Sequence, residues 1–287
     1  MPPEVLSRVT FEAIGTRWEI DTREPLTEVE RAGLDELIDE FDRTYSRFRD
    51  DSLVAELERD AGTWTFPDDS VALVELYRSL YRATDGAMTP LVGPSLESLG
   101  YGRDLTLEAG PALASYEWDD SMRWQGSTVS TTRGIGLDVG AAGKGLLVDH
   151  VSDFLSAHHP VLVDASGDMR YRGAEPVRVA LEHPYDARRA IGVVELAGGA
   201  LCASATNRRA WGEGLHHVLD GRTGLPVREV AATWVMAPTA MVADALATAL
   251  FFVGPDRLTD VADFSYVRMF TDGRAEYSPT LPGEIFR

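Results

Sequence analysis

The segment from Ala240 to Val253 restricts the fold more than any other part of the sequence. It is apolar almost all round, and a helix without a polar face must be covered on most sides by the rest of the protein. The longest apolar run, residues 245–254, falls far short of the ~20 residues that a membrane-spanning helix needs. The segment therefore predicts a helix in the core of a water-soluble fold.

The rest of the chain alternates short strand patterns with a few clear helices, in no regular order. No internal repeat and no low-complexity linker divides it, so we expect a single α+β domain over residues 1–287. Thr27 and Glu30 form a capping-box pattern at the start of the first helix. We expect helices at about residues 27–45, 68–85, 144–154 and 239–254, and strands at 17–21, 128–139, 160–164, 177–182, 192–204 and 229–236.

The charge of the chain excludes some classes of partner. Acidic residues number 46 against 27 basic ones, which gives a net charge of −19. Such an excess repels phosphate backbones and anionic lipids, so we expect no nucleic-acid partner and no membrane attachment. Residues 1–8 lack the pattern of a secretory signal or a lipobox, which favours a cytoplasmic location. Cys202, the only cysteine, lies in an apolar run and is expected to be buried.

Two polar residues interrupt the apolar segment, and their spacing places both side chains on the same face of the helix. Asp244 and Thr248 stand at positions i and i+4, on one face of the helix and one turn apart. A buried carboxylate requires a cation or several donors, and neighbouring hard oxygens suit Mg²⁺. The alternative is an Asp bonded to backbone amides and a Thr bonded back to its own helix, and the helix alone does not decide between them.

A turn of small residues, 138–145, leads from an expected strand into the third helix. Backbone amides at such a helix start can face an anion, and Lys144, the only lysine, could reach a phosphate there. The turn is not a Walker loop, because the required glycine spacing and the following Ser or Thr are absent. Taken singly, it is typical of a tight strand–helix turn with a solvated lysine.

Two further polar segments allow similar alternatives. His216 and His217 precede an Asp-Gly-Arg-Thr-Gly turn, and a histidine there could act as a base near neutral pH. Adjacent residues of a strand point to opposite faces, so at most one of the two can line a given site. By spacing alone, surface imidazoles beside a hairpin are the better interpretation, and residues 164–168 could likewise be a simple polar turn.

Together and in this order, these segments resemble the FAD:protein FMN transferases, the ApbE-type flavin transferases. The resemblance extends from Gly15 to Gly254 and depends on many short pieces: Ser46-Arg47-Phe48-Arg49 with Ser52, Asp85-Gly86-Ala87, Val92-Gly93-Pro94, the turn 138–145 with Val148-Asp149, Gly167-Asp168, His217 with Asp220, Arg222-Thr223-Gly224 with Pro226, and Ala243-Asp244 with Thr248. It implies one ApbE-like α+β domain with mixed or antiparallel sheets and packed helices.

The resemblance also implies a reaction and a set of site residues. Family members move FMN from FAD to a Thr or Ser hydroxyl of an acceptor protein with an FMN-binding domain, release AMP and require Mg²⁺. By resemblance, Asp244, Thr248 and the carbonyl of Ala141 would hold the metal, and His217 would be the base. FAD contacts would fall on Ile14, Phe48, Ala87, Met88, Thr89, Asp138, Lys144 and Leu219. The aromatic face of Phe48 suits a ring of the dinucleotide, with core packing as the alternative.

Several positions depart from the family pattern, and all touch the expected flavin pocket. Met88 and Thr89 replace an aromatic residue and an Asp, Gly221 replaces a proline, and residues 204–207 replace a Ser-Gly-Asp-Tyr stretch; Ser166 and Ile14 stand where a glycine and a methionine are common. Two other functions therefore stay open beside transfer. One is hydrolysis of FAD to FMN and AMP by the same site, and the other is FAD binding without chemistry.

Overall fold

The computed structural model describes residues 7–286. The expectation that no leader is present concerns residues 1–8 and lies largely outside this range. Within it, no helix combines the length and the apolar character that crossing a membrane requires.

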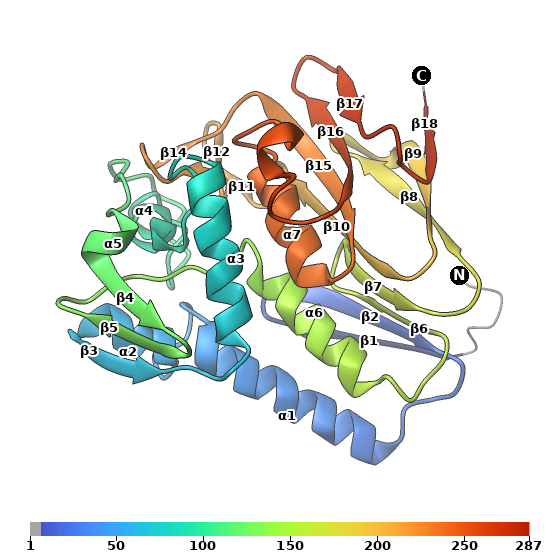
Figure 1. Cartoon of the computed structure of the whole chain (residues 1–287), viewed down its shortest axis with the longest axis horizontal. Coiled ribbons are helices and arrows are strands. Elements are labelled where there is room, and N and C mark those ends of the chain that lie inside the picture. Colours follow the sequence, from blue (N-terminus) through green and yellow to red (C-terminus); the bar gives the residue numbers. More distant parts are fainter. Residues whose placement is uncertain (1–6, 287) are drawn as a thin grey trace.

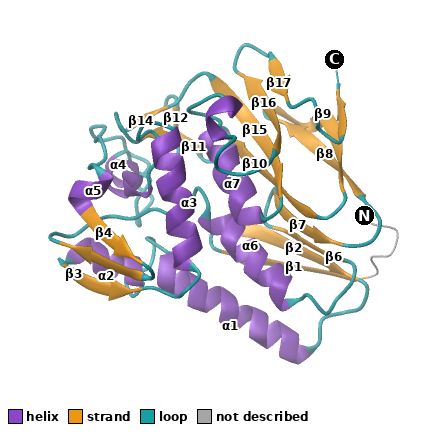
Figure 2. Ribbon diagram, in the orientation of Figure 1, coloured by secondary structure: helices purple, strands orange, loops and turns teal. Residues whose placement is uncertain are grey.

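An eight-stranded antiparallel sheet forms the centre of the fold (Figures 1 and 2). Its outer strands on one side are the hairpin β1 (Ser7–Ala13) and β2 (Thr16–Thr22). The order then continues through β6 (Val161–Asp164), β7 (Asp168–Arg172), β10 (Gly199–Ala205), β15 (Val230–Ala237), β16 (Ser265–Phe270) and β17 (Ala275–Tyr277). All neighbouring strands are antiparallel, as the α+β prediction allows.

Smaller sheets flank this central sheet. A three-stranded sheet with the order β18-β9-β8 packs on one of its faces and consists of β8 (Val177–His183), β9 (Asp186–Leu196) and β18 (Gly283–Ile285). A second, distant sheet holds β3 (Gly62–Thr65), β5 (Thr128–Thr131) and β4 (Met122–Gln125). Two short ribbons pair β11 (Ala210–Trp211) with β12 (Leu215–His216) and β13 (Leu219–Asp220) with β14 (Leu225–Pro226).

Helices cover the opposite face of the central sheet (Figure 2). The long ones are α1 (Glu28–Tyr45), α3 (Ser70–Ala83), α6 (Gly143–Phe154) and α7 (Ala240–Ala249). Shorter helices are α2 (Leu53–Arg59), α4 (Gly93–Ser98) and α5 (Trp118–Ser121), with 3₁₀ turns η1 (Pro90–Val92) and η2 (Pro255–Leu258). The predicted capping box of α1 is confirmed: the Thr27 amide donates to Glu30 Oε2 at 2.7 Å, and the Glu30 amide donates to Thr27 Oγ1 at 3.3 Å.

The prediction of a buried apolar helix is confirmed in α7, which lies between β10, β15, α3 and α6. Its residues Ala243, Leu246 and Ala249 have no exposed surface. The sheet beneath is bonded to the helix, because the Thr233 hydroxyl donates to the carbonyl of Ala247 at 2.6 Å. Cys202 also lies under α7 with no exposed surface, as predicted, and burial raises the pKa of its thiol well above the ordinary value.

The amino-terminal ends of α6 and α7 touch each other closely. A Cβ atom at Gly145 would overlap the carbonyl oxygen of Ala240, so only glycine permits this approach. Asp149, one turn further along α6, accepts hydrogen bonds from the amides of Ala240 and Met241, both at 2.9 Å. This carboxylate therefore satisfies two donors in the first turn of α7 that have no partner inside the helix.

Two of the predicted strands differ from the observed ones. The strand expected at 128–139 ends at Thr131, because the following residues bond to helix ends instead: the amide of Ile135 donates to Leu57 and that of Asp138 to Pro90, at 3.0 and 2.7 Å. The strand expected at 192–204 is two strands, β9 and β10, in different sheets. Gly198 and Gly199 separate them with φ angles of 100° and 76°, values that favour glycine. That residues 1–287 form one domain stays a prediction.

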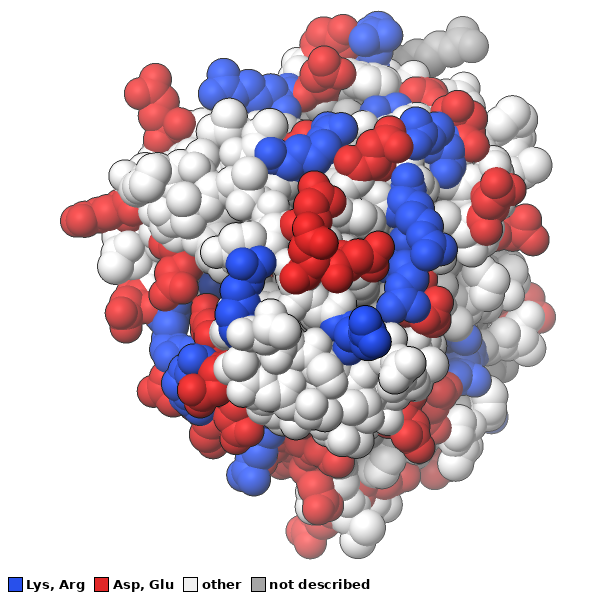
Figure 3. Space-filling model, turned by 60° about the vertical axis from the view of Figure 1, so that its left-hand side comes forward, with Lys and Arg blue, Asp and Glu red and all other residues white. Residues whose placement is uncertain are grey.

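The charged side chains are intermixed on the face shown in Figure 3, where red and blue side chains alternate with neutral surface. Many of the arginines are paired with carboxylates, as in the contacts Arg49–Asp51 and Arg78–Glu75 at 2.8 and 2.7 Å. The negative net charge is therefore spread over this face and is not gathered in one patch.

Replacement of Asp149 by alanine is expected to destabilise the fold by ~1–2 kcal/mol, because two amides at the start of α7 lose their acceptor. Urea unfolding of the purified protein measures this difference. Asp153→Ala is the matched control on the same helix, since the Asp153 side chain is 65% exposed and contacts Arg172. Equal midpoints for the two variants would contradict the capping role.

Candidate functional site

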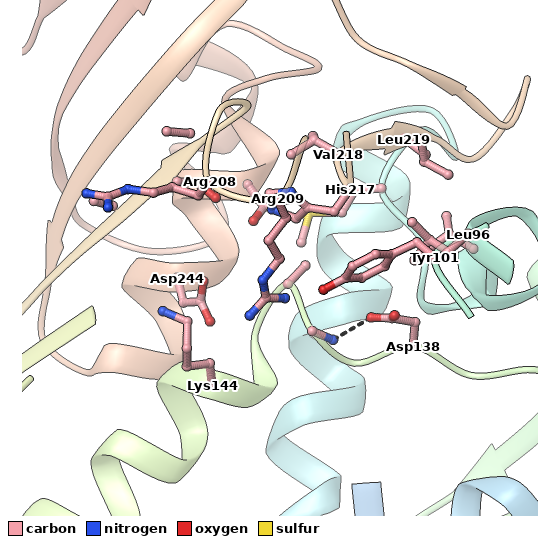
Figure 4. A pocket seen from close by; sticks show the side chains of 18 of the residues that line it. Leu96, Tyr101, Asp138, Lys144, Arg208, Arg209, His217, Val218, Leu219 and Asp244 are labelled. Carbon is pink, nitrogen blue, oxygen red and sulfur yellow. Dashed lines mark hydrogen bonds between the residues drawn. The ribbon is translucent and has the colours of Figure 1, made fainter. Parts of the chain in front are cut away.

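A cavity of about 380 Å³ opens where α6, α7, the end of β10 and the loop before β13 meet (Figure 4). We call it the central cavity. Nine of the twelve predicted site residues line it, although they come from segments far apart in the sequence: Met88, Thr89, Asp138, Ala141, Lys144, His217, Leu219, Asp244 and Thr248. The fold therefore brings together most of the positions predicted from the sequence.

Three charged side chains form a buried cluster at one end of the central cavity. The Lys144 ammonium pairs with the carboxylate of Asp168 and donates to the carbonyl of Ala165 at 3.2 Å. Asp244, 4% exposed, accepts a hydrogen bond from the amide of Gly145 at 3.0 Å. Lys144 is thus an ion-paired residue with a side chain only 17% exposed, and its interpretation as a solvated lysine is wrong.

With all three groups ionised, this cluster has one more negative than positive charge, and the pKa values of Lys144 and Asp244 are shifted. Burial would lower the pKa of Lys144, but the carboxylates of Asp168 and Asp244 raise it. Burial, followed by the neighbouring charge of Asp168, raises the pKa of Asp244 above its ordinary value. Apart from the contact with Lys144, neither oxygen of Asp168 finds a hydrogen-bond donor among the described residues. The cluster therefore lacks positive charge, and a cation would supply it.

The donor set beside this cluster fits a hard divalent cation. Thr248 and Ala141 line the cavity with Asp244, and a carboxylate, a hydroxyl and a carbonyl are oxygen donors that Mg²⁺ accepts. The alternative interpretation of this pair is a Thr bonded back to its own helix and an Asp bonded to backbone amides. The first half is wrong, because the Thr248 hydroxyl makes no hydrogen bond to its helix among the described residues. The second half holds for one amide, that of Gly145, which donates to Asp244. No group of three His, Cys, Asp or Glu side chains that could hold a metal occurs within residues 7–286. Hydroxyl and carbonyl oxygens would therefore have to complete the site.

The two adjacent histidines have separate environments, as strand geometry predicted. His216 is buried, and its Nε2 lies 2.8 Å from the carbonyl oxygen of Val227. His217 lines the central cavity, and its Nδ1 is buried without a partner among the described residues. Burial, together with the positive charge of Arg209, lowers the pKa of His217 to about 3. Its imidazole is therefore neutral near pH 7 and is a weak base in the free protein.

The carboxylate of Asp138 is fixed at the other end of the cavity by two hydrogen bonds. It accepts them from the amide of Gly140 at 2.7 Å and from Arg47 Nε at 2.6 Å (Figure 4 draws the first). Arg47 also donates to the carbonyl of Tyr101 at 2.7 Å. Burial alone would raise the pKa of Asp138, but Arg47 and the Gly140 amide lower it below its ordinary value. Asp138 is thus an ionised and rigidly oriented carboxylate.

Arg209 is a cation of the cavity that sequence reasoning did not identify. Its side chain extends from the loop between β10 and β11 into the space between Asp244 and Asp138 (Figure 4). Within the described part of the chain its guanidinium makes no ion pair, whereas the adjacent Arg208 pairs with Glu182 at 2.7 Å. Arg209 therefore presents a free positive charge to a ligand in the cavity.

A second cavity of about 470 Å³, here the side cavity, adjoins the central one and shares Tyr101, Asp138, Lys144 and Arg209 with it. The predicted residues Ile14 and Phe48 line it. Phe48 is 41% exposed and lies under the Arg47 guanidinium at 4.2 Å from ring centre to carbon, so the core-packing interpretation is wrong.

Ile14 occupies the turn between β1 and β2 in an unusual conformation. Its φ angle is 46°, and that of Gly15 is 72°. A β-branched residue rarely adopts positive φ, and such strain is concentrated at functional positions. The strained turn places Ile14 at the side cavity.

Comparison of the sequence with known protein families identifies the family of this chain. The sequence profile of the ApbE family matches residues 14–270, which is most of the chain. The chain belongs to the ApbE family. The resemblance inferred from the sequence is therefore confirmed.

Relatives and solved structures of ApbE proteins agree with this assignment. Proteins named FAD:protein FMN transferase from Klebsiella pneumoniae and Escherichia coli K12 are 26% and 27% identical to it; the alignments cover 100% and 83% of this chain and 87% and 75% of those proteins. The ApbE protein of Thermotoga maritima and the flavin transferase ApbE of Vibrio cholerae have TM-scores of 0.82 and 0.79 at 23% identity, over 96% of this chain and 97% of each of theirs. The predicted ApbE-like α+β fold is thus confirmed.

Two of the departures from the ApbE pattern contact each other. A Cβ atom at Gly221 would overlap the methyl group of Thr89, and the Gly221 amide donates to the carbonyl of Ala87 at 2.8 Å. A proline at position 221 would lose this donor and collide with Thr89. Ala87 itself, 1% exposed, lies behind the cavity wall and lines neither cavity, so its predicted FAD contact stays a prediction.

The His217 imidazole is expected to stay neutral in the folded protein down to about pH 5, because its pKa lies near 3 where the ordinary value is 6.5. Proton NMR of the imidazole Cε1–H resonance measures this, with the signal assigned by its loss in His217→Asn. A midpoint near the ordinary value would contradict the effect of burial and Arg209.

The same shift has a consequence for stability. The unfolded chain binds this proton first as the pH falls, so His217 lowers the free energy of unfolding between about pH 6.5 and pH 3. Above that window the group contributes no pH dependence.

Proposed function

We propose that this chain is an FAD:protein FMN transferase that moves FMN from FAD to a Thr or Ser hydroxyl of an acceptor protein and releases AMP. The observation that carries the proposal is the presence, in one cavity of an ApbE family member, of a neutral imidazole, an anionic oxygen cluster and a free guanidinium. Relatives that carry this name support it.

The size and connection of the two cavities suit a dinucleotide. Volumes of about 380 and 470 Å³ lie in the range of small-molecule sites. They meet at Asp138, Lys144 and Arg209, so one bent or extended ligand could occupy both. Apolar and aromatic walls at Leu219 and Phe48 would take the two ring systems, and the charged residues between them would face the pyrophosphate.

Asp244, Thr248 and the carbonyl of Ala141 would hold Mg²⁺, in agreement with the excess negative charge of the cluster. When bound, the ion would neutralise charge on the phosphate oxygens during cleavage. Asp168 orients Lys144, and Lys144 directs its ammonium toward the same space. Arg209 adds a second positive group on the opposite side.

His217 would act as the base for the acceptor hydroxyl. In the reaction the hydroxyl oxygen bonds to the phosphorus of the FMN moiety, its proton passes to the imidazole, and the bond from that phosphorus to the bridging oxygen breaks, so that AMP leaves with the oxygen. The low pKa in the free protein derives partly from Arg209. A phosphate bound to Arg209 would offset that charge and raise the basicity of His217 toward the useful range.

Replacement of Asp244 by asparagine is expected to lower Mg²⁺-dependent AMP release from FAD, with an FMN-binding-domain acceptor present, on the order of 100-fold. Asparagine keeps an acceptor for the Gly145 amide, so the fold should remain. AMP is quantified by chromatography and Mg²⁺ affinity by calorimetry, with the exposed Asp263→Asn as control. An unchanged rate and affinity would sink the metal assignment, and rapid AMP release without acceptor would favour FAD hydrolysis over transfer.

Replacement of Arg209 by glutamine is expected to slow AMP release by roughly 10- to 100-fold, because one positive group facing the phosphates is lost. In the free protein the pKa of His217 should rise at the same time, which the NMR titration detects and a purely structural defect would not produce. Arg189→Gln, an exposed arginine on β9, is the control. A slower rate with an unmoved His217 resonance would argue against the placement of Arg209 beside the imidazole.

A further inference from the structure

A third hollow adjoins the central cavity on the side away from the side cavity. It has a volume of about 320 Å³ and lies between β8 and the end of β10. We call it the β8 groove. It shares Ser166, Ala203, Ser204, Ala205 and Arg208 with the central cavity, and it shares no residue with the side cavity. The central cavity, with His217, is therefore the middle of three connected spaces.

The strand that borders the groove has a free edge. The order β18-β9-β8 leaves β8 with a neighbour on one side only. Its residues 179–182 all line the groove, although alternate residues of a strand point to opposite faces. Consecutive residues can share a wall only if the backbone edge of the strand faces it. Within the described part of the chain, no backbone group of β8 outside its pairing with β9 has a backbone partner.

The floor and rim of the groove differ in character. Leu181, Leu201 and Trp234, all nearly buried, form an apolar floor. The rim carries the ion pair of Glu182 with Arg208, and the amide of Asn207 donates to the carbonyl of Pro184. An exposed strand edge above an apolar floor is the arrangement that binds an extended peptide, with backbone hydrogen bonds for affinity and pockets for alternate side chains.

A transfer reaction requires two substrates to approach the same phosphorus from different directions. FAD would occupy the side and central cavities, which share the phosphate-facing residues Lys144 and Arg209. The β8 groove reaches the central cavity from the other side, through Ala203, Ser204 and Ala205. It is therefore placed for the second substrate.

We propose that the β8 groove binds the acceptor protein, whose flavinylated segment adds as an extended strand to β8 and directs its Thr or Ser hydroxyl toward His217. This inference rests on the proposed transferase function. The ligand of the β8 groove is then a peptide segment of the acceptor and not a part of FAD.

The test blocks the groove after folding. Ala180, exposed on β8, is replaced by cysteine and labelled with N-ethylmaleimide, and the native Cys202 stays unlabelled because it has no exposed surface. Labelling is expected to raise KM for an FMN-binding-domain acceptor about tenfold, the effect of losing one or two backbone hydrogen bonds. The affinity for FAD, followed by flavin fluorescence, should not change.

Ala187→Cys, labelled in the same way, is the matched control, because Ala187 is exposed on β9 and does not line the groove. Its label should leave the acceptor KM unaltered. An acceptor KM that is insensitive to the label at position 180, or a label that weakens FAD binding to the same extent, would overturn the groove assignment and leave the transferase function standing. Absence of transfer by the unmodified enzyme would overturn both proposals.

Discussion

The site depends on one contact, the close approach of the amino-terminal ends of α6 and α7. Gly145 permits it, Asp149 caps the first turn of α7, and the amide of Gly145 bonds to Asp244. The approach sets Lys144 on one helix against Asp244 on the other. Since both helices also pack on the central sheet, this geometry is fixed by the core and does not depend on a mobile loop.

The charges around the cavity are divided between its two sides. The cluster of Lys144, Asp168 and Asp244 has an excess negative charge, whereas Arg209 on the facing loop is an unpaired cation within the described chain. A pyrophosphate is itself anionic, so it needs positive charge on both sides. In the proposed function, Arg209 would provide one, and a cation at Asp244 would provide the other. A bound cation would make the burial of two carboxylates beside one lysine tolerable.

The features of the structure that depend on a local sequence pattern could be predicted from the sequence. The all-apolar helix with Asp244 and Thr248 one turn apart, the capping box at Thr27 and the opposite orientations of His216 and His217 follow from periodicity alone. Lys144 was misinterpreted without its family context, because its partner Asp168 reaches it only through the β6–β7 hairpin. Arg209 lies in an irregular loop, where no spacing indicates direction. Long-range pairing, and not local propensity, decides such contacts.

The residues of the site come from both the amino-terminal and the carboxy-terminal parts of the chain. Ile14 lies in the first turn, and Asp244 and Thr248 lie in the last long helix. A chain that is still being synthesised therefore lacks Asp244, whose carboxylate accepts a hydrogen bond from the Gly145 amide at the start of α6, until almost all of its residues have been added. Because domains fold as units during synthesis, the capacity to cleave a pyrophosphate would arise late and all at once. On the proposed function, an unfinished chain would therefore not consume FAD before the residues of the β8 groove have been synthesised.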